Sequence, residues 1–160
     1  YTSMKFDRET MGKLWDETTP KLFGYLVNIL RDKALAEDIL QSTWTKALEA
    51  LPTYRDRGLP FSAWLFAIAR NECKLHWRKS GHEIPLDVQE HDVSIEPLPD
   101  HVILAQQILS RLPEEDRELL RLRYIADLSM NEIAKILNTN SVAVRVRIHR
   151  ALKRAQQNYV

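Results

Sequence analysis

Two groups of cationic side chains have types and spacings that suit nucleic-acid binding. In the first group Arg70, Lys74 and Arg78 recur every four residues, so a helix would place them on one face. Aromatic rings can stack on unpaired bases while cations follow the phosphate backbone. Tyr54 and Phe61 lie on or beside a predicted loop close to these cations. The combination therefore predicts a site for single-stranded nucleic acid.

The second group lies on the last predicted helix, which carries a dense run of cations beside an apolar stripe: Arg145, Arg147, His149, Arg150, Lys153 and Arg154. Guanidinium forks can read guanine edges in a major groove, and other cations neutralise phosphates. A basic helix taken alone fits a solvated surface better. The segment before it changes that interpretation, because Ser129-Met-Asn-Glu132 is a capping box and Asn138-Thr-Asn140 is a turn. With Ser141 as the expected cap of the last helix, the pattern predicts a helix-turn-helix.

The sequence offers no support for catalysis, a metal or another cofactor. No nucleophile and base, phosphate loop or group of carboxylates occurs at a catalytic spacing. Cys73 is the single cysteine, so it has no partner for an internal disulfide or a metal pair. The 5 histidines are scattered, with none at the helical spacing of a metal motif.

The elements that must position these residues are predicted to be helices. Only 4 glycines occur, and apolar residues recur at helical spacing through most of the chain, which predicts an all-α fold. Thr19-Pro20 is expected to break the first helical segment or to begin a helix. A second helix is expected from about Ala34 to Leu51, ended by Pro52. The segment 53–60, which includes Arg55 and Arg57, is expected to be an exposed loop.

Composition and the distribution of charge indicate two helical domains. The 160 residues are 44% hydrophobic and 28% charged, as in a soluble globular protein, and the net charge is only +1. Between Gly81 and Ser110 there is no lysine or arginine, whereas acidic residues and prolines are frequent. Such a segment is typical of a linker, so two domains are favoured over one continuous core.

The chain is expected to stay in the cytoplasm. No apolar run approaches the roughly 20 residues that a membrane-spanning helix needs. The segment from Tyr1 to Arg8 lacks the basic-then-apolar order of a secretory signal, and Met4 is a candidate native start residue.

Five stretches occur in an order that is specific to one family. Ala36-Glu37-Asp38-Ile39-Leu40-Gln41 is followed by Trp64-Leu-Phe-Ala-Ile-Ala-Arg-Asn71, and the second half contains Leu112-Pro-Glu-Glu-Asp-Arg117, Leu128-Ser-Met-Asn-Glu-Ile-Ala134 and Val144-Arg-Val-Arg-Ile-His-Arg-Ala151. From about Met11 to Gln157 the chain resembles the extracytoplasmic-function (ECF) sigma factors of bacterial RNA polymerase. The resemblance implies sigma region two at residues 5–80, a flexible linker at 81–99 and sigma region four at 100–160.

The resemblance also implies a role for each surface of a non-catalytic specificity subunit. Core RNA polymerase would be bound by Glu37, Asp38, Leu40, Gln41 and Trp44. The melted, single-stranded minus-ten element would be bound by Tyr54, Arg55, Arg57, Phe61, Arg70, Asn71, Lys74 and Arg78. The duplex minus-thirty-five element would be bound by Ser141, Arg145, Val146, Arg147, His149, Arg150 and Lys153. An anti-sigma factor is the further partner implied, and it could hold the protein at the membrane.

Three positions depart from the family pattern. Leu75 stands where the melting helix commonly has an aspartate, four residues after Asn71. Ala143 and Val146 replace hydroxyl-bearing residues of the last helix, so phosphate contacts there are expected to differ, and Val146 could contact a thymine methyl group.

Two other functions remain open at this level. An autonomous helix-turn-helix regulator would need only the second domain and would leave the first domain unexplained. A helical adaptor that does not bind DNA would treat both basic faces as solvated surface, and its binding would not depend on salt.

Overall fold

The computed structural model describes residues 6–55, 58–81 and 100–159, and all regular structure in these ranges is helical. The all-α prediction is therefore confirmed. Residues 82–99, which make up nearly all of the predicted linker, lie outside the described residues. The elements are α1 (Arg8–Leu30), α2 (Lys33–Ala50), η1 (Leu51–Thr53), α3 (Phe61–Lys79), α4 (Asp100–Ser110), α5 (Glu114–Leu120), η2 (Arg121–Ile125), α6 (Met130–Ile136) and α7 (Ser141–Tyr159).

Helix α1 is continuous, so the predicted break at Thr19-Pro20 is wrong. Pro20 lies inside the helix, where its missing N–H and its ring cost roughly 3 kcal/mol. Leu22, Tyr25 and Leu26 directly follow it, and each is 0% exposed. Burying each such side chain contributes about 1.5–3 kcal/mol, so packing outweighs the local penalty.

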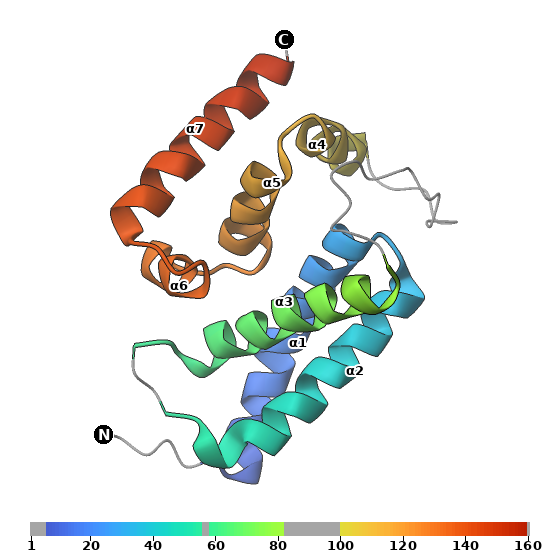
Figure 1. Cartoon of the computed structure of the whole chain (residues 1–160), viewed down its shortest axis with the longest axis vertical. Coiled ribbons are helices and arrows are strands. Elements are labelled where there is room, and N and C mark those ends of the chain that lie inside the picture. Colours follow the sequence, from blue (N-terminus) through green and yellow to red (C-terminus); the bar gives the residue numbers. More distant parts are fainter. Residues whose placement is uncertain (1–5, 56–57, 82–99, 160) are drawn as a thin grey trace.

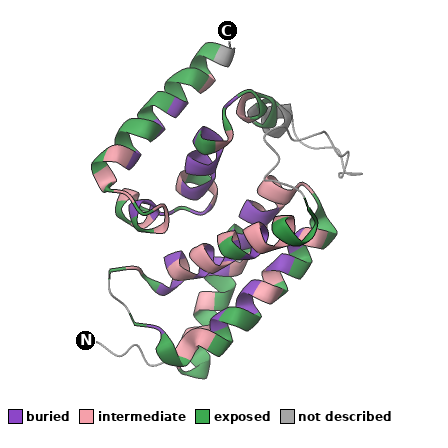
Figure 2. Cartoon of the chain, viewed as in Figure 1, coloured by how far each residue is buried: buried purple, intermediate pink, exposed green. Residues whose placement is uncertain are grey.

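The first unit consists of α1, α2 and α3 packed side by side (Figure 1). Its buried residues lie on the facing sides of the helices, while the outer sides are exposed (Figure 2). Helix α3 presents Leu65, Phe66 and Ala69 to this core, and none of them is more than 1% exposed. The same helix leaves Asn71 and Arg78 in solvent, so it serves both as a core element and as a surface.

The second unit contains the predicted helix-turn-helix. The capping box is present: the Ser129 hydroxyl accepts a hydrogen bond from the Glu132 N–H, and the Glu132 side chain accepts one from the Ser129 N–H. After α6, Asn138 adopts a left-handed conformation with φ of 56° and turns the chain. The cap of α7 is Asn140 rather than Ser141, because the Asn140 Oδ1 accepts a hydrogen bond from the Ala143 N–H at 2.9 Å. Ser141 is already the first helical residue.

The prediction of two helical domains is confirmed, and the two units touch each other. Helix α1 packs on η2, and α3 packs on α6, so both units contribute to one connected set of buried apolar residues. In Figure 1, α5 lies between α7 on one side and α1 and α3 on the other. Contacts between residues so distant in sequence leave no periodic signal from which they could be predicted.

The cap assignment gives a first prediction. Asn140→Ala removes the side chain that accepts the Ala143 N–H and should lower the free energy of unfolding by about 1 kcal/mol. Ser141→Ala, one residue later, should change it by less than about 0.5 kcal/mol, since helix position N1 needs no side-chain acceptor. Urea unfolding followed by circular dichroism measures both. Equal losses for the two variants would contradict the assignment.

Candidate nucleic-acid interface

The cationic face of α3 exists as predicted, but its members differ in exposure. Asn71 and Arg78 are exposed, whereas Arg70 and Lys74 are half-buried. The neighbouring Arg70 guanidinium, and secondarily burial, lowers the pKa of Lys74 because two positive charges repel each other. A bound phosphate would relieve that repulsion, which makes this face suitable for an anion.

Arg70 already has an anionic partner from the second unit. Its Nε donates a hydrogen bond to Glu118 of α5 at 3.0 Å, and the two side chains are only 19% and 11% exposed. The Tyr25 hydroxyl of α1 donates to the same carboxylate oxygen. Burial, and then the Glu118 charge, raises the pKa of Tyr25 well above its usual range, so the hydroxyl keeps its proton.

The two aromatic residues expected to stack on bases are part of the core. Tyr54 is 8% exposed and Phe61 is 2% exposed, so the prediction that their faces are available to a base is wrong. Their rings pack against each other at 5.8 Å and against Trp64, at 4.8 Å from Tyr54 and 5.5 Å from Phe61. Phe6 packs on both rings as well. Burial of these rings is favourable because packing against one another removes their apolar surface from water.

The loop between η1 and α3 is held from within. The Tyr54 hydroxyl donates to the Leu59 carbonyl at 3.0 Å, and the exposed Arg55 donates to the Pro52 and Tyr54 carbonyls. Gly58 has φ of 86°, a conformation that favours glycine. Arg57 lies outside the described residues.

Helix α7 presents its predicted cations to solvent. Val144, Ile148 and Ala151 are buried and fix the rotation of the helix. Six of the predicted residues are exposed and Ser141 is half-buried; the exposed ones are Arg145, Val146, Arg147, His149, Arg150 and Lys153. Arg147 and Arg150 also line the cavity between the units, beside Arg154, whose guanidinium pairs with Asp116 of α5 at 2.6 Å.

The proposed polymerase-binding residues of α2 form an exposed face, with one exception. Glu37, Asp38 and Gln41 are exposed and Leu40 is half-buried. Trp44 is only 3% exposed, so its expected place on the surface is wrong. Its Nε1 donates to the Thr19 hydroxyl at 3.2 Å, which satisfies the indole and allows it to be buried.

Trp15 takes the surface position that was expected for Trp44. It is 47% exposed, and its ring packs on Trp44 with 4.6 Å between ring centroids. Leu48, one helical turn after Trp44, is 52% exposed. Gln41 and Trp44 were a weak sequence signal for a protein interface, because tryptophan is common at such surfaces. That Trp15 of α1 lies on this face could not be predicted without the fold.

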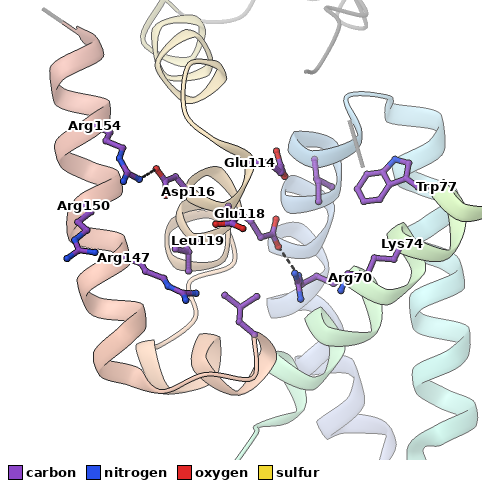
Figure 3. A pocket seen from close by; sticks show the side chains of 13 residues that line it. Arg70, Lys74, Trp77, Glu114, Asp116, Glu118, Leu119, Arg147, Arg150 and Arg154 are labelled. Carbon is purple, nitrogen blue, oxygen red and sulfur yellow. Dashed lines mark hydrogen bonds and ion pairs between the residues drawn. The ribbon is translucent and has the colours of Figure 1, made fainter. Parts of the chain in front are cut away.

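A cavity of about 500 Å³ lies between the units, lined by α1, α3, α5, α7 and Leu137. Figure 3 shows Arg70 pointing toward Glu118 from one side and Arg154 pointing toward Asp116 from the other. Carboxylates of α5 thus face cations of both predicted DNA-binding helices. Sequence reasoning did not single out Glu118 or Asp116.

Over the part of the chain that the structure describes, no group of three or more histidine, cysteine, aspartate and glutamate side chains is arranged to hold a metal ion. None of the described helices is both long and apolar enough to cross a membrane.

Comparison with known proteins gives the family. Residues 14–83 match the family model of Sigma-70 region 2, and residues 103–154 match that of Sigma-70, region 4. The ECF RNA polymerase sigma factor SigD of Mycobacterium tuberculosis is 31% identical over 96% of this chain and 79% of that protein. This chain belongs to the ECF sigma factors. The ECF sigma factor BldN of Streptomyces coelicolor is 28% identical over 92% of this chain, which spans 59% of that protein.

Two solved structures have the same fold. The sigma factor RpoE of Bartonella quintana, crystallised with the anti-sigma factor NepR, superposes with a TM-score of 0.73 at 26% identity, covering 93% of this chain and 96% of that one. CnrH, solved with the cytosolic domain of CnrY, gives a TM-score of 0.68 at 24% identity, covering 95% of this chain and 88% of that one. Membership in the ECF sigma factors supports a role as a promoter-specific initiation factor of RNA polymerase.

The environment of Cys73 in this sigma factor gives a second prediction. The thiol is 0% exposed on α3, and burial raises its pKa to about 12. Because the reactive species is the thiolate, a disulfide reagent at about pH 8 should react with the native protein far more slowly than with a free thiol. One thiol per chain should react at once in denaturant. Rapid labelling of the folded chain would contradict this burial.

Proposed function

We propose that α2, α3 and α7 of this sigma factor bind core RNA polymerase, the minus-ten element and the minus-thirty-five element, respectively. The observation that carries the proposal is that each helix buries one stripe and leaves a polar or cationic face exposed. Helices α2 and α3 lie within the residues that match Sigma-70 region 2, and most of α7 lies within those that match region 4. The chain would act as a dissociable specificity subunit and would catalyse no reaction itself.

The docking face on α2 comprises Glu37, Asp38, Leu40 and Gln41, with Trp15 beside them in place of the buried Trp44. Exposed carboxylates would select a basic partner surface, and the half-exposed Trp15 ring would supply apolar contact area. Trp44 would contribute indirectly, because it supports Trp15 from beneath.

The minus-ten element would bind Arg70, Asn71, Lys74 and Arg78 on α3. Guanidinium and ammonium groups would follow the phosphates, and the Asn71 amide could read a base edge. Since Tyr54 and Phe61 are buried, they would hold the loop in place, and the exposed Arg55 would meet the displaced strand.

The minus-thirty-five element would bind the exposed side of α7 in the major groove. Arg145 and Arg150 can form bidentate bonds to guanine, and Lys153 can neutralise a phosphate. Val146 is 42% exposed and has the chemistry to contact a thymine methyl group. Ser141, Arg147 and His149 complete the face.

The partners and the location are proposed from membership in the family. The similar sigma factor RpoE was solved with an anti-sigma factor, which supports an anti-sigma partner for this chain too. The protein would work in the bacterial cytoplasm, with retention at the membrane possible only through such a partner. Domain limits of 5–80, 81–99 and 100–160 remain a prediction.

Transcription in vitro tests the proposed docking face. With core polymerase and a promoter library, the wild-type chain should start RNA at promoters that share two sequence elements. The Asp38→Arg, Gln41→Ala double variant should lower initiation at least about tenfold, since charge reversal at an interface hot spot costs more than a kilocalorie. Glu17→Arg, an exposed reversal on α1, is the control and should initiate normally.

The outcomes of that experiment separate the possible functions. Initiation that survives the double variant would keep the sigma role and place the docking surface elsewhere. Failure of the wild type to start RNA, together with tight binding of duplex DNA by the chain alone, would favour an autonomous regulator.

Salt dependence tests the α7 face. Lys153→Ala should weaken binding of the holoenzyme to promoter fragments of every sequence, and should reduce the slope of log affinity against log salt by about 1. Gln157→Ala on the same helix is exposed but uncharged, so it should leave the slope unchanged. A slope unaffected by Lys153→Ala would mean that this face is solvated surface.

A further inference from the structure

Helix α5 lies between α3 and α7 and pairs one carboxylate with a cation of each helix. Glu118 pairs with Arg70 of α3, and Asp116 pairs with Arg154 of α7. Figure 3 shows these two pairs on opposite sides of the α5 helix. Each carboxylate occupies a guanidinium that could otherwise pair with a phosphate oxygen.

The Glu118 carboxylate joins three elements at once. One oxygen accepts hydrogen bonds from Tyr25 and Arg70 of the first unit, and the other accepts one from Arg121 of its own unit at 3.2 Å. Arg121 also donates from Nε to the Asn28 Oδ1 of α1 at 2.7 Å. The Arg70 and Glu118 side chains are largely shielded from water, so their charge-assisted hydrogen bond is stronger than that of an exposed ion pair.

A second polar contact joins the second unit to the loop that precedes α3. The Lys135 ammonium of α6 donates to the Gly58 carbonyl at 2.6 Å. This contact links α6 of the second unit to the loop. Arg70 and the loop thus each have a polar contact with the second unit.

We infer that Glu118 is an internal phosphate mimic that holds the free chain closed and occupies Arg70 until the two units separate. This inference rests on the proposed function of α3. A closed chain leaves Arg55, Asn71 and Arg78 exposed but withholds Arg70, so single-stranded DNA binds weakly. Separation of the units, as required to reach two distant promoter elements, frees Arg70 for a phosphate.

The test compares Glu118→Gln with Glu115→Gln in the full chain. The first variant keeps the side-chain shape and removes the charge that Arg70 and Arg121 pair with; the second removes the same charge from an exposed neighbour on α5. Small-angle scattering reports the radius of gyration, and anisotropy of a short fluorescein-labelled single-stranded DNA of randomised sequence reports binding.

Glu118→Gln should enlarge the radius of gyration and tighten DNA binding about tenfold, because one charge-assisted bond accounts for a shift of that size. Glu115→Gln should leave both at the wild-type values. Tyr25→Phe removes a single hydrogen bond from the first unit and should give a smaller change in the same direction. If circular dichroism shows that Glu118→Gln has lost its helix content, the Tyr25→Phe variant tests the inference instead.

The possible failures are distinguishable. A folded Glu118→Gln chain with the wild-type radius and DNA affinity would overturn the inference, even if transcription by the holoenzyme proceeds normally. A larger radius without tighter DNA binding would support closure by Glu118 and would contradict the assignment of α3 to the minus-ten element.

Discussion

The Glu118 carboxylate is the point on which the arrangement of the two units depends. A carboxylate that is only about one-tenth exposed must be paired, because an uncompensated buried charge costs several kilocalories per mole. Tyr25, Arg70 and Arg121 supply that pairing from α1, α3 and η2. Each of these donors also belongs to a helix with its own core contacts, so one ionised group fixes how three packed elements meet.

Helix α3 has one side that packs in the core and another that carries cations. Leu65, Phe66 and Ala69 bury one stripe of the helix, and Arg70, Lys74 and Arg78 form a cationic stripe on another side. The same helix therefore cannot rotate to relieve the repulsion between Arg70 and Lys74 without exposing its core. An anion is the remaining source of relief, and Glu118 provides it within this chain.

Aromatic residues show how packing decides between two plausible positions for a side chain. Tyr54, Phe61 and Trp44 all lie where a sigma factor could expose a ring, yet all three are buried. Each has a neighbour that makes burial favourable: other rings surround Tyr54 and Phe61, and the Thr19 hydroxyl satisfies the Trp44 indole. Trp15 is left half-exposed on the same surface because its neighbour Trp44 occupies the interior.

Local patterns were sufficient to predict the all-α class, the order of the helices, the capping box at Ser129 and the cationic faces of α3 and α7, because caps and periodicity act over a few adjacent residues. The continuity of α1 through Pro20, the inward rings and the pairing of Arg70 with Glu118 were decided only by tertiary structure. Each of these depends on residues far apart in the chain, whose packing energy exceeds the local preference and leaves no periodic trace in the sequence.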